Sequence, residues 1–256
     1  MAHASHEAPE DSLTLSPQGG RGAHPRERQQ PMNRNVRKSW VVGSGVIIVV
    51  AGLVLLRDGI AEASPPSCGT GAVWRVSDTS EAWKGVWVQQ PGGGTTYSGR
   101  WLKAGEPTVT AVLVISASGD RVSFRRTDDP NKFQVTDCLY DGTFGADGAS
   151  ASGTVTCNSA AGKLGPFNWT AQISCNDPRP NFEVNIDRPG SDYRHFELEV
   201  ADPANCWAQC ELESECVAFA YVNPDVQGPK ASCWLKSSVP AQVPNATFAT
   251  SGVKGS

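Results

Sequence analysis

The chain has 256 residues and carries 26 acidic against 22 basic residues, so its formal net charge is −4. This balance excludes the basic surface that nucleic-acid-binding proteins need, and we expect no nucleic acid among the partners. With 26 glycines, 18 prolines and only 19% charged residues, the composition disfavours a long helical bundle and favours loop-rich β structure. Both methionines lie in the first 32 positions and all eight cysteines lie beyond Ser67, which suggests a disulfide-bonded ectodomain behind an N-terminal targeting segment.

The first 31 residues show no apolar periodicity. They contain four prolines, scattered charges and three of the four histidines, a composition that buries too little apolar surface to offset the entropy of ordering. We therefore predict that residues 1–31 are a disordered tail, or that the start is mis-assigned and the protein begins at Met32.

Residues 32–63 have the features of an export signal. A positive patch that ends at Lys38 precedes an uncharged run over residues 40–56, and Ala61-Glu-Ala63 is a small-x-small triplet of the kind that signal peptidase cleaves. A helix over that run spans about 25 Å, short of the roughly 30 Å hydrocarbon core of a bilayer. We predict a signal peptide cleaved between Ala63 and Ser64; the alternative is an uncleaved membrane anchor through residues 40–56.

Both interpretations place the rest of the chain outside the cytoplasm, because the Arg/Lys patch stays on the cytoplasmic side. The protein is then secreted, periplasmic or extracellular, or it is a single-pass membrane protein with its C-terminal ectodomain outside. Cysteines form disulfides in such oxidising compartments.

The first expected domain, residues 68–175, has the pattern of β-strands, because short alternating runs are separated by turn residues. Turn signals such as Gly92-Gly-Gly94 separate the runs, and no helical period interrupts them. We expect an antiparallel meander, closed into a small barrel or folded as a sandwich. Seven strands are predicted: residues 85–90, 96–102, 109–115, 121–125, 133–140, 151–157 and 167–174.

One hairpin of this domain predicts a disulfide. Asp147-Gly148 is a strong signal for a two-residue turn. Pairing that continues outward from this turn brings Cys138 opposite Cys157, and directly opposed residues lie within disulfide range. We therefore expect a Cys138–Cys157 bond, which leaves Cys68 and Cys175 to join the two ends of the domain.

Five tryptophans fall in the same domain. One interpretation is that they fill the core of a small barrel, because each buries a large area. The other is that they form an aromatic platform for a ligand. A void lined by several of them would favour a small-ligand carrier, whereas a filled core favours an interaction scaffold. The five residues are Trp74, Trp83, Trp87, Trp101 and Trp169.

The second expected domain, residues 181–254, follows a turn-rich linker over residues 176–180. It opens with Asp187-Arg-Pro-Gly-Ser-Asp-Tyr193, and Asp202-Pro203 then begins a helix with Asp as the N-cap and Pro at the first helical position. The sequence continues with Cys206-x3-Cys210, Cys216 followed by Val-Ala-Phe-Ala-Tyr-Val, Cys233-Trp-Leu-Lys236 and Ser251-Gly-Val253.

At these residues the sequence resembles the PAN/apple module, in the short bacterial PAN form that lacks the disulfide joining the termini of apple domains. The resemblance implies a helix cradled against a curved antiparallel sheet, with the bonds Cys206–Cys233 and Cys210–Cys216. The expected fold class is therefore mainly β, with a barrel or sandwich followed by an α+β C-terminal module. The competing interpretation is a zinc site, but the cysteine spacing lacks paired Cys-x2-Cys knuckles and the oxidising compartment opposes it.

The sequence favours a binding protein over an enzyme. The ectodomain has a single histidine, His195, and none of the common nucleophile, metalloprotease, phosphate-loop or calcium-loop motifs. The PAN resemblance implies recognition of an extracellular protein or glycan, and candidate contacts are Tyr193, Tyr221 and Trp234. The alternative is a small-ligand carrier or enzyme inhibitor centred on the N-terminal β domain. No catalytic residue, cofactor or metal is expected.

Overall fold

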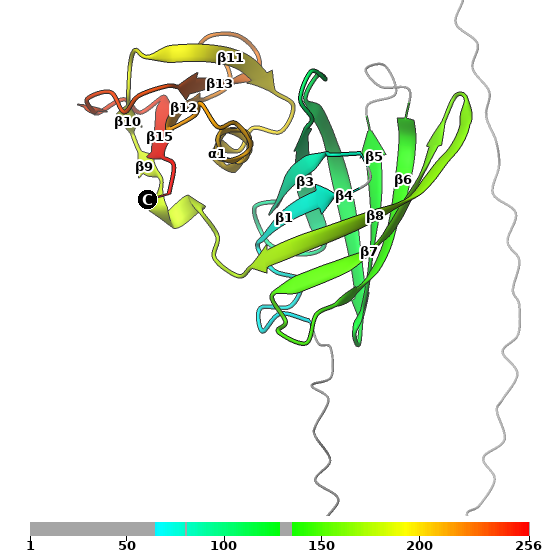
Figure 1. Cartoon of the computed structure of the whole chain (residues 1–256). Coiled ribbons are helices and arrows are strands. Elements are labelled where there is room, and N and C mark those ends of the chain that lie inside the picture. Colours follow the sequence, from blue (N-terminus) through cyan, green and yellow to red (C-terminus); the bar gives the residue numbers. More distant parts are fainter. Residues whose placement is uncertain (1–64, 80, 129–134, 256) are drawn as a thin grey trace, which may run out of the picture. The chain divides into compact units, whose positions relative to one another are not determined.

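The computed structural model describes residues 65–79, 81–128 and 135–255 (Figure 1). The N-terminal tail, the export segment of residues 32–63 and its cleavage site at Ala63 and Ser64 lie outside the described residues. Within the described part of the chain, no helix is both long and apolar enough to cross a membrane.

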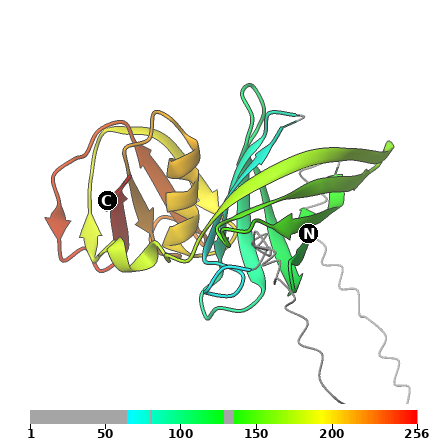
Figure 2. The ribbon, with the colours of Figure 1, turned by 60° about the horizontal axis from the view of Figure 1, so that its bottom comes forward.

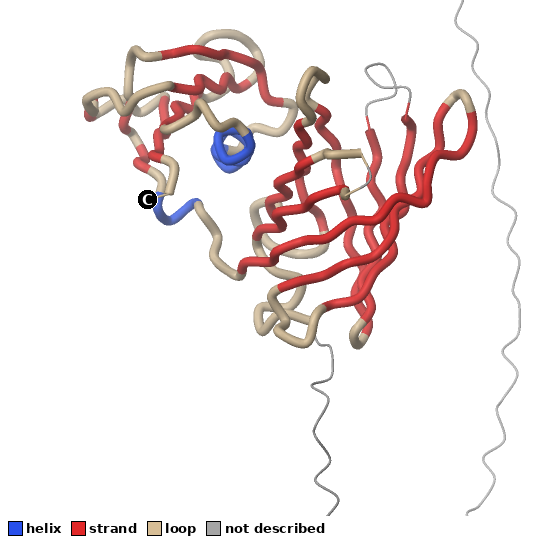
Figure 3. Tube along the Cα trace, in the orientation of Figure 1, coloured by secondary structure: helices blue, strands red, loops and turns tan. Residues whose placement is uncertain are grey.

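The N-terminal half of the described chain is a closed barrel of eight antiparallel strands, shown in red as strands in Figure 3. Each strand pairs with its neighbour in sequence, and β1 pairs with β8 to close the barrel. The expected meander is thus confirmed, and it is a barrel and not a sandwich. The strands are β1 Val73–Asp78, β2 Lys84–Gln89, β3 Thr96–Leu102, β4 Val109–Ser118, β5 Arg121–Asp128, β6 Val135–Phe144, β7 Ser150–Ser159 and β8 Gly162–Ser174.

The prediction of seven strands was wrong by one, because it missed β1. Two consecutive residues of this strand are buried, since Val73 is 1% exposed and Trp74 is 0% exposed. Trp74 belongs to the barrel core, whereas Val73 packs in the core cluster of the C-terminal module. Buried and exposed residues alternate only from Trp74 to Ser77, and a run of four residues is a short signal for a strand.

The β6–β7 hairpin has the expected register but a longer loop than expected. Cys138 pairs with Cys157, as predicted from pairing outward from the Asp147-Gly148 turn, and their Cα atoms are 4.0 Å apart. The backbone N–H of Gly145 donates to the carbonyl of Ser150, so the loop has four residues. Asp147 Oδ1 holds it by accepting bonds of 3.0 Å from the backbone N–H groups of Ala149 and Ser150. The observed register of β6 and β7 equals the predicted one, because the four-residue loop has the same centre as the expected two-residue turn.

Two inward-facing tryptophans lie against positions that have no side chain. An added Cβ would come within 2.8 Å of the Trp101 ring at Gly85 and within 2.5 Å of it at Gly99. At Gly142 an added Cβ would come within 2.6 Å of the Trp169 ring. The missing side chains therefore make room on the inner wall for two indole rings.

The C-terminal module packs one α-helix, α1 (Pro203–Leu212), against a sheet (Figure 2). Asp202 is the N-cap and accepts a bond of 3.0 Å from the backbone N–H of Ala204, and Pro203 is the first helical residue, as expected. The five-stranded sheet has the order β11-β13-β12-β15-β9, and β10 pairs separately with β14. The remaining elements are η1 Arg179–Asn181, β9 Glu183–Val184, β10 Ile186–Asp187, β11 Asp192–Leu198, β12 Ala218–Val222, β13 Ala231–Lys236, β14 Val243–Pro244 and β15 Ala249–Val253.

All eight cysteines lie in the described part of the chain, and all are disulfide-bonded. The bond between Cys206 and Cys233 joins α1 to β13, and the bond between Cys210 and Cys216 closes the loop after the helix. Together with Cys68–Cys175 and Cys138–Cys157, these are the four pairs expected from the sequence.

The barrel and the C-terminal module share a buried apolar cluster. Val86 and Val88 of β2 pack in the same cluster as Trp207 and Ala208 of α1. Arg179, in the junction between the two parts, donates to Asp202 Oδ2 over 2.5 Å and to a backbone carbonyl of β2 over 2.7 Å. Continuous burial across the junction makes the two parts one packed unit.

Candidate functional site

The barrel contains a cavity of about 490 Å³ at the end where β1 and β5 finish and β4 begins. Most of the side chains around it are apolar or aromatic, and the other five are ionisable. The volume falls in the range of small-molecule sites, about 300–1,000 Å³. The cavity is lined by Val76, Asp78, Glu81, Trp83, Trp101, Glu106, Pro107, Val109, Arg126, Asp128, Val135, Tyr140, Val155, Cys157, Leu164, Phe167 and Trp169.

The tryptophans divide between filling the barrel and lining this cavity. Trp74 and Trp87 are fully buried and pack edge-on against Phe124, with ring centroids 4.7 Å and 4.9 Å apart. Trp101 and Trp169, together with Trp83, line the cavity. Trp74, Trp87, Trp101 and Trp169 all belong to the barrel core, which confirms the first interpretation, whereas the aromatic platform for a ligand stays a prediction.

A charged pair lies in the cavity wall. Arg126 donates two hydrogen bonds to Asp128, from Nε over 2.6 Å and from Nη2 over 2.5 Å. Its guanidinium also lies 4.3 Å from the centroid of the Trp101 ring. Burial by itself lowers the pKa of Arg126, but Tyr140 and Asp128 outweigh it and raise the pKa above its ordinary value. Arg126 is therefore a charged guanidinium whose charge Asp128 balances.

The rim of the cavity is acidic. Asp78 is half-buried, and Glu81 and Glu106 are exposed. One ammonium group lies beside them, since Lys103 Nζ is 3.2 Å from Glu81 Oε2 and 5.6 Å from the centroid of the Trp83 ring. The described lining residues thus carry four carboxylates against one guanidinium.

Sequence reasoning missed Arg126, Asp128 and the acidic rim. The predicted strand ended at Arg125, but β5 continues to Asp128. Along the full strand Val122, Phe124, Arg126 and Asp128 share one face. A longer strand in the prediction would therefore have revealed an arginine and an aspartate facing an apolar interior.

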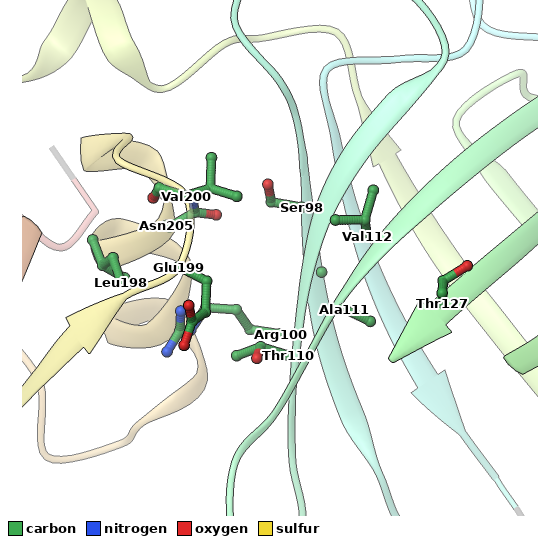
Figure 4. A pocket seen from close by; sticks show the side chains of 11 residues that line it. Ser98, Arg100, Thr110, Ala111, Val112, Thr127, Leu198, Glu199, Val200 and Asn205 are labelled. Carbon is green, nitrogen blue, oxygen red and sulfur yellow. Dashed lines mark hydrogen bonds between the residues drawn. The ribbon is translucent and has the colours of Figure 1, made fainter. Parts of the chain in front are cut away.

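A second, smaller pocket of about 150 Å³ lies between the barrel and the C-terminal module (Figure 4). Arg100 of β3 is 7% exposed here, and its Nε donates to Gln209 Oε1 of α1 over 2.8 Å. Burial lowers the pKa of Arg100 to about 9; the charge of Arg194 also lowers it, and Glu213 opposes both. The volume is below that of most ligand sites, so we do not assign a ligand to this pocket. The hydrogen bond between Arg100 and Gln209 joins the barrel to the C-terminal module here.

The three candidate contacts of the C-terminal module lie in different surroundings. Tyr193 is half-buried, and its hydroxyl hydrogen-bonds with Glu213 Oε2 over 3.0 Å. Tyr221 is 4% exposed and belongs to the module's core. Trp234 is half-buried, and its Nε1 donates to Gln227 Oε1 over 2.9 Å. The structure therefore does not bring the three side chains together on one surface.

Trp234 instead pairs with His195, which the sequence marked only as the single histidine of the ectodomain. The two side chains lie opposite each other on β11 and β13, and their rings stack with centroids 4.1 Å apart. His195 is exposed, so the stacked pair forms an aromatic surface on the outside of the module. No group of three or more His, Cys, Asp or Glu side chains in the described residues is placed to hold a metal ion.

Comparison with known families gives one match. Residues 186–236 match the family model of the PAN domain, within the region that resembles PAN in its sequence. No curated protein and no solved structure shows significant similarity to the chain. The C-terminal module is therefore identified as a PAN domain over residues 186–236, and the barrel has no family assignment.

Proposed function

We propose that the protein is a non-catalytic binding protein that works outside the cytoplasm and recognises an extracellular protein or carbohydrate through its PAN domain. The family match supports binding of this kind, and the four disulfides fit an extracellular location. In this proposal residues 68–175 and 181–254 are two domains joined by residues 176–180.

The observation that carries the proposal is the stacked pair of His195 and Trp234. Trp234 is held in place by its hydrogen bond to Gln227, so little side-chain entropy remains to be lost on binding. Rigid aromatic side chains supply much of the binding energy at recognition surfaces, and tryptophan is enriched among them. Tyr193 contributes less in this proposal because its hydroxyl is bonded to Glu213, and Tyr221 supports the surface from within.

Binding of the full chain to a glycan array and to candidate secreted proteins tests this proposal. We expect His195→Ala and Trp234→Leu to weaken binding at least tenfold. Phe248→Ala is the matched control, because Phe248 is another exposed aromatic side chain of the module, 41% exposed. If the His195 and Trp234 variants bind as tightly as the wild type, the contact surface lies elsewhere.

The barrel cavity supports a second candidate function, which is the carriage of a small ligand. A neutral apolar probe such as 4-phenylbutanol should bind at a single site. Leu164 lines the cavity and is 40% exposed, so Leu164→Trp adds bulk at the mouth without disturbing the buried core. This variant should bind the probe at least tenfold more weakly while keeping the wild-type unfolding midpoint.

Residues 32–63 act as the export signal in this proposal, with cleavage between Ala63 and Ser64 or retention as an anchor through residues 40–56. The intact mass of the exported protein, measured with and without reductant, distinguishes these outcomes. The expected product begins at Ser64 and gains the mass of eight hydrogens on full reduction, two for each disulfide. A product that retains residues 40–56 would indicate the anchor.

A further inference from the structure

We propose that the barrel cavity binds a small organic cation, an amine or quaternary ammonium compound with a ring-bearing apolar body. This inference rests on the second candidate function above, that the barrel carries a small ligand, and it specifies the chemical class of that ligand.

The apolar body follows from the walls of the cavity. Trp101, Trp169 and Phe167 line it together with valines from several strands. The volume of about 490 Å³ is sufficient for a molecule with a ring and a short chain. Aromatic walls favour a ring-bearing ligand, because aromatic pairs add attraction beyond the area that they bury.

The positive charge follows from the balance of ionisable groups. Arg126 is neutralised within the wall, because two of its nitrogen atoms bond to the two carboxylate oxygens of Asp128. The rim then carries Asp78, Glu81 and Glu106; Lys103 pairs with Glu81, and Asp78 Oδ1 accepts a bond of 3.0 Å from the backbone N–H of Glu81. The Glu106 carboxylate has no hydrogen bond or ion pair with any described residue. A cleft lined by charge of one sign concentrates ligands of the opposite sign.

The chain's own cations already bind at the cavity in the way that a ligand cation would. Lys103 lies over the Trp83 ring with its ammonium group beside Glu81. Arg126 lies over the Trp101 ring with its guanidinium bonded to Asp128. Each cation contacts both an aromatic ring and a carboxylate, and aromatic rings are the groups that proteins use to recognise ammonium ligands. The cavity wall therefore supplies suitable partners for a further cation.

Three compounds with the same body and different charge test the inference. They are 4-phenylbutylammonium, 4-phenylbutanol and 4-phenylbutyrate, titrated into the full exported chain at low salt by calorimetry. The ammonium compound should bind at least tenfold more tightly than the carboxylate, with the alcohol between them. Raising the ionic strength should weaken binding of the ammonium compound and leave that of the alcohol unchanged, because salt screens exposed charges.

Two matched variants locate the effect at the rim. Glu106→Gln removes a carboxylate of the rim and should weaken ammonium binding about threefold to tenfold without changing alcohol binding. Asp120→Asn is the control, because Asp120 is an exposed aspartate in the β4–β5 turn at the opposite end of the barrel. Equal binding of the ammonium compound to Glu106→Gln and to the wild type would overturn the role of the rim.

The possible outcomes distinguish failure of the cation preference from failure of ligand carriage by the barrel. If the carboxylate binds as tightly as the ammonium compound, the cation preference is overturned while ligand carriage stands. If none of the three compounds binds, or if Leu164→Trp binds them as the wild type does, both the cation preference and ligand carriage by the barrel fail.

Discussion

Arg100 Nε donates a hydrogen bond of 2.8 Å to Gln209 Oε1, and this bond joins strand β3 of the barrel to helix α1 of the PAN domain. Both side chains are buried, at 7% and 0% exposure. Gln209 Nε2 also donates to Glu213 Oε1 over 2.7 Å, so one amide links the barrel arginine to a carboxylate of the PAN domain. A buried polar link of this kind fixes the relative position of the two parts only while every member has its partner.

Replacing Gln209, which carries the amide, should therefore lower the free energy of unfolding more than replacing Arg100, which carries the charge. Gln209→Leu leaves Arg100 buried without its bond and should lower the free energy of unfolding by about 1–3 kcal/mol. Arg100→Met leaves Gln209 Oε1 buried without its donor but also removes a costly buried charge, so the two effects offset each other and the free energy should fall by less than about 1 kcal/mol.

Urea unfolding of the full chain measures both variants. Gln172→Leu is the control, because Gln172 is exposed on β8 and the change should stay within about 0.5 kcal/mol. A larger loss for Arg100→Met than for Gln209→Leu would contradict this account of the interface.

Removing the disulfide that spans the barrel should destabilise the protein more than removing the one after the helix. Cys68 and Cys175 are 107 residues apart in sequence, whereas Cys210 and Cys216 are 6 apart. The chain-entropy model then predicts losses of about 4–5 kcal/mol and about 2 kcal/mol, respectively. Double alanine variants of each pair, compared by thermal and urea unfolding, check this order. The reverse order would mean that loop closure is not the main contribution of these bonds.

A side chain at Gly99 should disturb the cavity wall. The added Cβ of Gly99→Ala would lie 2.5 Å from the Trp101 ring and 2.6 Å from Leu113, so Trp101 must move. We expect a loss of about 1–3 kcal/mol from overpacking and a change in tryptophan fluorescence. Gly228→Ala is the control, since its Cβ would meet only one atom, at 4.0 Å. If both variants are equally stable, Trp101 has more freedom than the packing indicates.

Acid should remove the contribution of Glu183 to stability. The hydrogen bond from Arg188 lowers the pKa of Glu183; burial opposes this effect and the bond from Gln242 adds to it. Because the folded pKa lies below the unfolded value, the stabilisation is complete above the unfolded pKa. It is lost as the pH falls through the folded pKa.

Glu183→Gln should therefore be less stable than the wild type at pH 7, and the difference should shrink as the pH is lowered below the unfolded pKa of Glu183. Urea unfolding over this range gives the difference at each pH. Glu215→Gln is the control, because Glu215 is exposed and is not bonded to Arg188; this variant should change stability little over the same pH range. A difference for Glu183→Gln that grows on acidification would contradict the sign of this linkage.

Much of the PAN domain could be predicted from its sequence, because its signals are local. Asp202-Pro203 specifies the helix start within two residues, and Cys206 and Cys210 follow on one helical face. The β6–β7 register was also predictable, since the position of a turn determines the pairing of both strands. The contact surface was not, because Tyr221 and Trp234 belong to similar strand patterns, yet one is in the core and the other pairs with His195 on the outside.

The barrel shows where local signals end. Strand β1 was missed because its alternating run, from Trp74 to Ser77, is only four residues long. The last three residues of β5 were missed because Arg126 and Asp128 are charged. The cavity depends on glycines of three different strands that leave room for Trp101 and Trp169. No single segment of the sequence contains that information.

The sequence by itself determined the β-rich composition, the place of the turns and the Cys138–Cys157 pair, because each depends on residue types at short spacing or on a single turn. The resemblance to PAN implied Cys206–Cys233 and Cys210–Cys216, and Cys68–Cys175 was the pair that remained. Only the tertiary structure decided that the meander closes as a barrel, that the barrel keeps a cavity with an acidic rim, and that the PAN helix packs against β2. These features arise from packing between segments distant in sequence, where the side chains of one strand decide how much room another has.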